Sequence, residues 1–121
     1  MKTRLFSMFL AASMAICSCS GVITQDDSSV TVKVQQSAEE GPALVRLEVL
    51  GEKLIRVSAT PEKRFADPQS LVVLPSDTQT PFEVLHEGDT IAVVTKALRA
   101  NVLATTGEVW FTAADGTLLL R

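Results

Sequence analysis

Short apolar segments that alternate with polar residues follow one another along the chain from residue 30 onward. Within residues 43–60, apolar side chains occupy every second position on both sides of a turn at 51–53. Successive residues of a strand point to opposite faces, so these apolar residues share one face. Arg46, Glu48 and Arg56 take the other face. The pattern predicts a β-hairpin, with Arg56 in a structural ion pair rather than on a substrate.

The remaining segments extend this pattern to the end of the chain. Turn residues separate about nine predicted strands, at 30–34, 45–49, 55–59, 71–74, 82–84, 91–95, 98–102, 109–112 and 118–120. Residues 96–104 also suit a helix, but their neighbours pair readily as a meander, which favours a strand. Strands at this spacing predict an all-β fold, an antiparallel β-sandwich or a barrel. We expect its core to include Leu47, Val49, Ile55, Val57, Val72, Ile91 and Val93.

The first 18 residues have the features of an export signal. Lys2 and Arg4 precede an apolar stretch of 12 residues, 5–16, which is too short to span a bilayer. Ser18 then precedes Cys19, as in a bacterial lipobox, where the cysteine is acylated. Cys17 fits less well because Ile16 would take the small-residue position. Ordinary cleavage near Ser20 is the alternative.

This leader predicts an exported lipoprotein of a bacterial membrane, on the periplasmic or the cell-surface face of the outer membrane. Residues 1–18 form the signal peptide, 19–29 the lipidated Cys19 and a polar tether, and 30–121 a partial β-sandwich domain. Starting at Cys19 leaves 103 residues, enough for one small domain. Without the leader, the chain has nine basic and 14 acidic residues, which gives a net charge of −5. This balance argues against a nucleic-acid partner.

Candidate catalytic chemistry is sparse. The single histidine, His86, is predicted in a surface turn without the converging partners that a metal site requires. No nucleophile elbow or phosphate-binding glycine loop occurs, and both cysteines lie in the leader. Paired acids such as 26–27 and 39–40 are interpreted as solvated surface charges. We therefore predict no catalytic residue, no metal and no cofactor in this chain, and no substrate-binding residue can be assigned.

Few aromatic side chains are available for a sugar platform. Trp110 and Phe111 are adjacent in a predicted strand, so they should point to opposite faces, one buried and the other facing either solvent or a missing partner. Phe82 is expected in the core. Phe65 is interpreted as a loop anchor in preference to a contact at the rim of a pocket. The three leucines at 118–120, directly before the last residue, predict a longer parent whose later strands cover them.

Three runs of residues resemble a known family. VRLEVLGEKLIRVSATPEKRF (45–65), SLVV (70–73) and TIAVVTKALRANVLATTGEVWFTAADGTLLL (90–120) are similar to the start of glycoside hydrolase family 31. The resemblance implies a galactose-mutarotase-like N-terminal β-sandwich in front of a catalytic (β/α)₈ barrel. It also implies a retaining α-xylosidase or α-glucosidase that acts on oligosaccharides. The family's Trp-x-Asp-Met-Asn nucleophile motif is absent, so no catalytic residue can be transferred to this chain.

These observations lead to one main hypothesis and two alternatives. The chain is predicted to be the non-catalytic support domain of a lipid-anchored family 31 glycosidase, truncated before its barrel and inactive by itself. The first alternative is a small surface lipoprotein with a β-sandwich that binds glycan or protein without catalysis. The second is a purely structural envelope lipoprotein.

Overall fold

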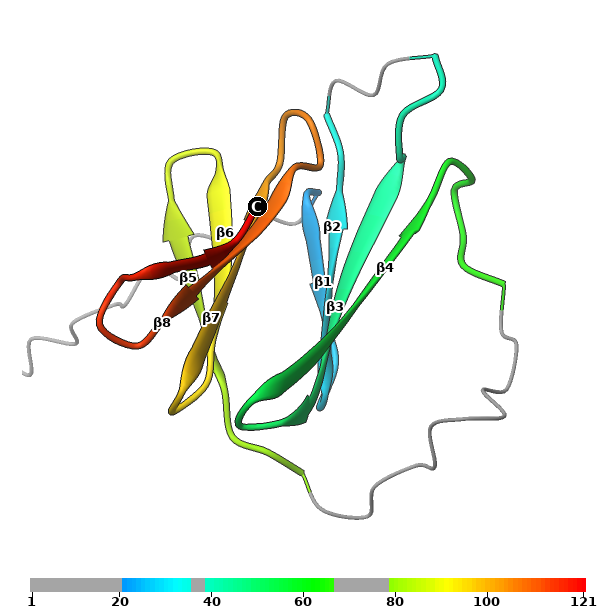
Figure 1. Ribbon diagram of the computed structural model, residues 1–121. Coiled ribbons are helices and arrows are strands. Elements are labelled where there is room, and N and C mark those ends of the chain that lie inside the picture. The colour runs from blue at the N-terminus through cyan, green and yellow to red at the C-terminus, as the bar shows by residue number, and fades with distance from the viewer. Residues whose placement is uncertain (1–20, 36–38, 67–78) are drawn as a thin grey trace, which may run out of the picture.

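The structure of the chain, a computed structural model, describes residues 21–35, 39–66 and 79–121. These residues form two antiparallel sheets (Figure 1). The four-stranded sheet has the order β1-β2-β3-β4, and the five-stranded sheet the order β5-β6-β7-β8-β9. The strands are β1 (Ile23–Gln25), β2 (Ser29–Lys33), β3 (Leu44–Gly51), β4 (Leu54–Thr60), β5 (Glu83–Glu87), β6 (Thr90–Val94), β7 (Leu98–Leu103), β8 (Val109–Ala113) and β9 (Leu118–Leu120).

The alternating segment at 43–60 forms the predicted hairpin, β3 and β4. Leu47 pairs with Val57 on one face, and Glu48 pairs with Arg56 on the other. Along β3 the side chains alternate between buried and half-buried positions. The register of the pair shifts between Val49 and Gly51, where the chain enters the turn. The period-two pattern therefore fixed both the hairpin and its inner face.

The segment from 83 to 120 forms a meander in which each strand pairs with the next. β7 covers Leu98–Leu103, so the helical alternative for residues 96–104 is wrong. The Asp115-Gly116 turn connects β8 to β9, with Gly116 at φ +89°. Asp115 Oδ1 accepts a hydrogen bond of 2.9 Å from the Thr117 backbone N–H, which closes the turn. No helix that could span a membrane occurs within the three described ranges.

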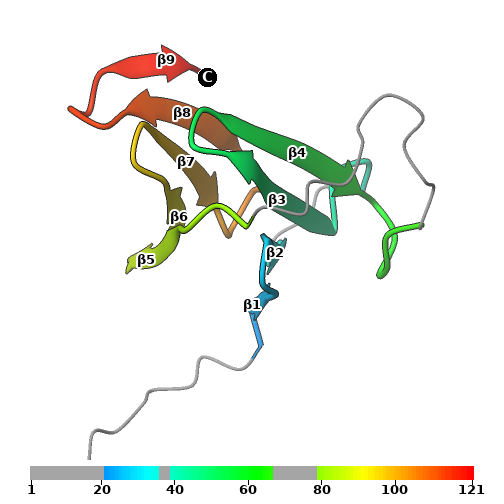
Figure 2. The same cartoon turned by 90° about the horizontal axis from the view of Figure 1, so that it is seen from below.

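The two sheets face each other as a sandwich, which confirms the predicted fold class (Figure 2). Hydrogen bonds join the layers: Thr95 Oγ1 donates to Glu52 O at 2.6 Å, and Gln35 N to Ala104 O at 2.8 Å. The fully buried side chains come from both sheets, and the largest of them are Leu47, Val30, Val32, Val45, Val93 and Val102. Burying a side chain of this size stabilises the fold by about 1.5–3 kcal/mol.

The predicted core is correct at five positions and wrong at one. Leu47, Val49, Ile55, Ile91 and Val93 are buried, whereas Val57 remains 39% exposed. Val57 points the same way as its partner Leu47, but β4 is an edge of its sheet. An edge residue has a neighbouring strand on one side, so its side chain receives less cover.

The start of the domain also differs from the prediction. Residues 19–29 were expected to form a tether, but β1 (Ile23–Gln25) pairs with β2 and the Val22 carbonyl accepts from the Lys33 N–H at 2.7 Å. The sheet therefore begins at Ile23 rather than at Val30. Cys17 and Cys19, and the predicted strand 71–74 with Val72, lie outside the described residues.

Candidate functional site

His86 lies in a strand rather than in the predicted turn. It is exposed on β5, the edge strand of its sheet, where it pairs with Ile91. The turn consists of the next residues, with Gly88 at φ +63°. Among the described residues, no group of three or more His, Cys, Asp or Glu side chains is placed to hold a metal ion.

Glu48 of the four-stranded sheet forms an ion pair with a neighbouring strand. Arg56 Nε donates to Glu48 Oε2 at 2.8 Å, and its Nη2 contacts the same oxygen. This pair confirms the interpretation of Arg56 as a partner in a structural ion pair. Because the two side chains are 39% and 23% exposed, water screens the pair and its contribution to stability is about 0–1 kcal/mol.

Two carboxyl groups near the end of the chain have lowered pKa values. The hydrogen bond from Arg121, Nε to Oε1 at 2.7 Å, and the charge of that guanidinium lower the pKa of Glu108. Hydrogen bonds from Thr117 lower the pKa of Asp115. A general acid of a glycosidase needs a raised pKa, so both shifts have the wrong direction for that role.

The aromatic side chains take three different places. Phe82 and Phe111 pack against the core, as expected from their strand positions. Phe65 is half-buried, and the Arg46 guanidinium lies 4.2 Å from the centre of its ring. This cation–π contact ties the segment after β4 to its sheet, which supports the loop-anchor interpretation. Trp110 points outward, opposite Phe111 as predicted.

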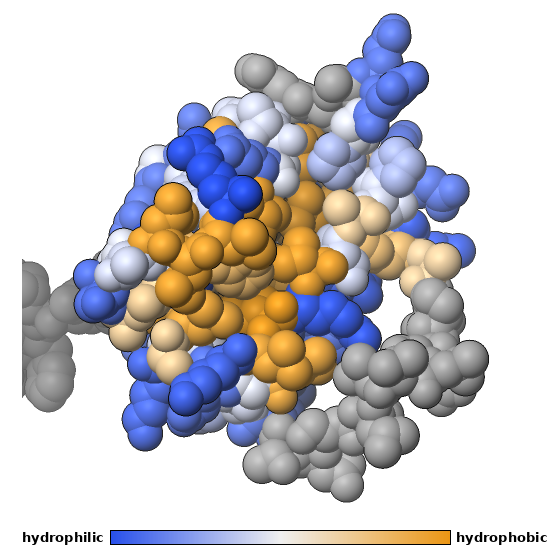
Figure 3. All heavy atoms as spheres, in the orientation of Figure 1, coloured by the Kyte–Doolittle hydropathy of each residue, from blue (hydrophilic) through white to orange (hydrophobic). Residues whose placement is uncertain are grey.

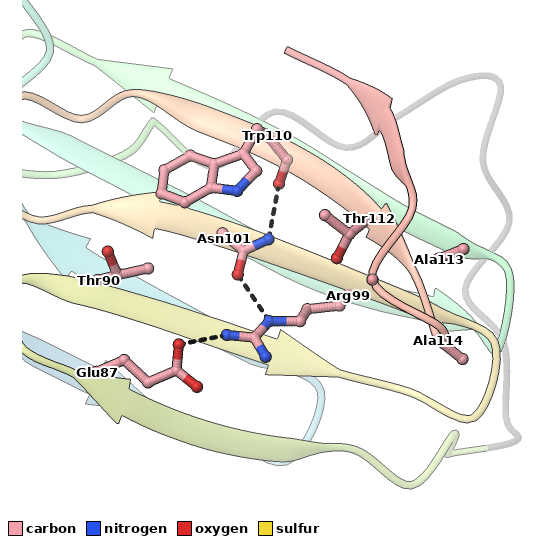
Figure 4. A pocket seen from close by; sticks show the side chains of 9 residues that line it. Glu87, Thr90, Arg99, Asn101, Trp110, Thr112, Ala113 and Ala114 are labelled. Carbon is pink, nitrogen blue, oxygen red and sulfur yellow. Dashed lines mark hydrogen bonds and ion pairs between the residues drawn. The ribbon is translucent and has the colours of Figure 1, made fainter.

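A groove of about 370 Å³ lies on the outer face of the five-stranded sheet (Figure 4). Strand register brings its residues together, because Glu87 pairs with Thr90, Arg99 with Thr112 and Asn101 with Trp110. The lining residues come from β5 to β8 and from the turn before β9: Glu87, Thr90, Arg99, Asn101, Trp110, Thr112, Ala113, Ala114 and Gly116.

A hydrogen-bonded row of side chains crosses this groove. Arg99 Nη2 donates to Glu87 Oε2 at 2.7 Å, and Arg99 Nε donates to Asn101 Oδ1 at 2.8 Å. Asn101 is 2% exposed, and its Nδ2 lies 3.4 Å from the Trp110 carbonyl oxygen. The buried amide holds the guanidinium along β7, so that Arg99 and the Trp110 indole border one hollow (Figure 4).

The side of the sandwich where β4 and β9 lie is open and apolar. Figure 2 places β4 and β9 at the same side of the two layers, and Figure 3 shows apolar surface between them. On β9, Leu118, Leu119 and Leu120 are 57%, 55% and 63% exposed. Leu54 and Val57 on β4 are also exposed. We call these five residues the open side.

One solved structure is similar to this chain both in sequence and in fold. The GH31 α-xylosidase Xac1773 of Xanthomonas citri aligns with 78% of this chain at 34% identity and a TM-score of 0.67. The alignment covers 10% of the α-xylosidase, so this chain spans about a tenth of that protein's length. No family model matches the chain.

A second protein shares the fold at lower identity. The uncharacterized protein lmo2446 of Listeria monocytogenes EGD-e aligns with 82% of this chain at 17% identity and a TM-score of 0.61. One of its two crystal structures is a complex with α-D-glucose, β-D-glucose, magnesium and calcium. Here too the alignment covers a small part, 9%, of the longer protein.

The class of protein follows from these findings together. The described residues form a two-layer antiparallel β-sandwich of the kind found as one domain of much larger proteins. In particular, the chain has the fold of the N-terminal domain of glycoside hydrolase family 31, which confirms the resemblance seen in the sequence.

Proposed function

We propose that the chain is the non-catalytic N-terminal support domain of a lipid-anchored family 31 α-glycosidase. The full-length parent would hydrolyse α-xylosidic or α-glucosidic bonds of oligosaccharides. The similarity to an α-xylosidase at 34% identity, over 78% of this chain but 10% of that enzyme, supports this proposal. A chain that spans a tenth of such an enzyme and has the fold of its N-terminal β-domain would serve to position the catalytic domain.

The open side is the structural observation that carries the proposal. The leucines of β9 are more than half exposed, although full burial of one leucine stabilises a fold by about 1.5–3 kcal/mol. Contiguous exposed apolar surface of this kind marks an interaction site. β4 and β9 are also edge strands, whose free backbone groups suit a neighbouring body. A catalytic barrel packed on this side would cover both the leucines and the edges.

The non-catalytic role rests on what the described carboxylates do. Glu48, Glu87 and Glu108 each form an ion pair with an arginine. A retaining glycosidase needs two carboxyl groups about 5 Å apart across a sugar pocket, one of them with a raised pKa. Each of the three glutamates is instead held by an arginine, and the pKa of Glu108 is lowered. The chemistry would therefore take place in the barrel.

An activity assay tests the support role. The purified chain is expected to leave 4-nitrophenyl α-xyloside and α-glucoside intact, whereas a product that continues into a barrel with a Trp-x-Asp-Met-Asn motif hydrolyses one of them. Reading the gene past the codon for Arg121 shows whether such a continuation is encoded. Turnover by the purified chain itself, or a stop codon there without a frameshift, would contradict the proposal. The second result would favour the small surface lipoprotein.

The membrane anchor is a second part of the proposal. Acylation of Cys19 would hold the domain close to the bilayer, because the β-ladder begins at Val22 and Ile23. Three residues of extended chain reach about 10 Å. Metabolic labelling with an alkyne fatty acid is expected to label the wild type and Cys17→Ala but not Cys19→Ala. If Cys19→Ala is still labelled, Cys19 is not the acylated residue.

A further inference from the structure

The groove on the outer face of the five-stranded sheet has no role in the proposed support function. It lies on the face away from the core, while the open side consists of β4 and β9 residues. Its volume of about 370 Å³ is at the lower end of the range for small-molecule sites. A ligand of the size of one or two sugar rings fits such a hollow.

The charges of the groove cancel. Arg99 is paired with Glu87 at 2.7 Å, and next to the indole Arg121 is paired with Glu108 at 2.7 Å. A site for phosphate or another anion requires an excess of positive charge, and a cation site requires free carboxylates. The groove offers neither, so it suits an uncharged ligand with many hydrogen-bonding groups.

The indole supplies an apolar surface beside these polar groups. Trp110 is half-buried, and the Arg121 guanidinium lies 6.0 Å from the centre of its ring. The face of an indole ring is a flat apolar surface, so it can pack against the C–H face of a pyranose while the sugar hydroxyls reach polar neighbours. This combination of flat apolar and polar surface matches a saccharide better than a purely apolar ligand.

A buried hydroxyl group points to a missing polar partner. Thr112 Oγ1 is buried beneath the groove and has no hydrogen-bond partner among the described residues. Buried polar atoms are normally paired, so an unpaired one at a hollow gains a partner if a small rotation of its side chain lets a water or a ligand hydroxyl reach it. This observation is independent of the charge balance and of the indole.

From these features we infer that the groove is a binding site for an uncharged saccharide. A pyranose ring packs on Trp110, and its hydroxyls bond to Glu87, Arg99 and Thr90. Asn101 acts as a positioning residue, since it is buried and fixes Arg99 through the 2.8 Å hydrogen bond. The site would keep oligosaccharide near the anchored protein.

Titration of the ¹⁵N-labelled chain with maltotriose, cellotriose and xylotriose tests this inference by NMR. We expect the Trp110 indole N–H signal and the backbone signals of β7 and β8 to shift with a millimolar dissociation constant for at least one trisaccharide. Trp110→Ala should weaken binding about tenfold, because the ring contact is lost, and Trp110→Phe should restore most of it. Arg56→Ala, in the ion pair of the other sheet, is the matched control and should bind like the wild type.

A charge variant provides the second measurement. Glu87→Gln leaves the positive charge of Arg99 unbalanced, so this variant should bind trigalacturonate more tightly than the wild type does. No shift with any trisaccharide at tens of millimolar, or shifts that Trp110→Ala leaves intact, would overturn the inference. These assays require no glycosidase activity, so their failure would leave the support role untouched.

Discussion

Gly107 lies where the two sheets of the sandwich interlock, and replacing it with alanine should destabilise the fold strongly. The residue has φ +79°, in the left-handed region that side chains disfavour. A Cβ atom placed there would lie 2.9 Å from Pro42 Cγ and 3.0 Å from Val34 Cγ2. Both atoms belong to the opposite sheet or its loop, so the substitution disturbs the packing between the two sheets.

The size of the effect follows from two separate costs. The left-handed backbone costs about 1–2 kcal/mol for a residue with a Cβ. Overpacking a filled site costs about 1–3 kcal/mol, because the proline ring is rigid and Val34 is a buried β-branched residue that cannot turn away. Gly107→Ala should therefore lose about 2–5 kcal/mol of the free energy of unfolding. A domain of this size has about 5–15 kcal/mol in total.

Gly116→Ala is the matched control for this substitution. Gly116 has a similar backbone, φ +89°, but apart from its two chain neighbours no atom of the described residues lies within 4 Å of its added Cβ. Its loss should be limited to the backbone cost of about 1–2 kcal/mol. Urea unfolding of dilute samples, followed by Trp110 fluorescence, gives both values, and the difference between them is the contact cost.

A double variant makes the test sharper. If the clash with Val34 is real, Gly107→Ala should be less damaging in a Val34→Ala background, with a coupling energy of about 0.5–3 kcal/mol. Equal losses for Gly107→Ala and Gly116→Ala, within about 0.5 kcal/mol, would refute the argument that this glycine is required by close packing of the sheets.

Two further predictions concern the end of the chain. The pKa of Glu108, lowered by Arg121, should return to the ordinary carboxyl range in Arg121→Gln, while that of Asp115 stays low. In the wild type, the stabilising effect of the Glu108–Arg121 pair is fully present above the ordinary carboxyl pKa and is lost as the pH falls through the lowered pKa of Glu108. Titration followed by the carboxyl ¹³C signals checks both groups. The exposed leucines of the edge strand β9 should make the isolated chain self-associate, and Leu120→Lys should reduce this in sedimentation experiments. The substitution should change the unfolding free energy by less than about 0.5 kcal/mol. Unchanged association would show that β9 is not the contact.

Local patterns in the sequence were sufficient for most of the strands and for their inner faces. The alternation at 43–60 predicted the β3–β4 hairpin with Arg46 and Arg56 on its outer face, and adjacency placed Trp110 and Phe111 on opposite sides of β8. These predictions succeed because the direction of a side chain in a strand depends on its parity alone. The Asp115-Gly116 turn is equally local, since it requires one residue with positive φ.

The groove was missed because its residues are far apart in the sequence. Glu87, Arg99, Asn101 and Trp110 meet through the register of four strands. Arg99 and Asn101 alternate with apolar residues, so the sequence already indicates that they lie on the outer face of the strand. Together with the tight turns of the meander, this could have placed them beside the indole. β1 was also missed, because residues 23–25 are mostly polar and show no clear alternation. They form a strand because they pair with β2.

The sequence by itself determined most of the strands of the described residues, except β1 and the second half of β5, and the apolar side of those strands. The tertiary structure decided how much of each apolar side is covered: Leu47 is fully buried and its partner Val57 is 39% exposed, although both follow the same alternation. The physical reason is that the direction of a side chain is set by its own backbone, whereas its burial is set by atoms from strands that are distant in the chain.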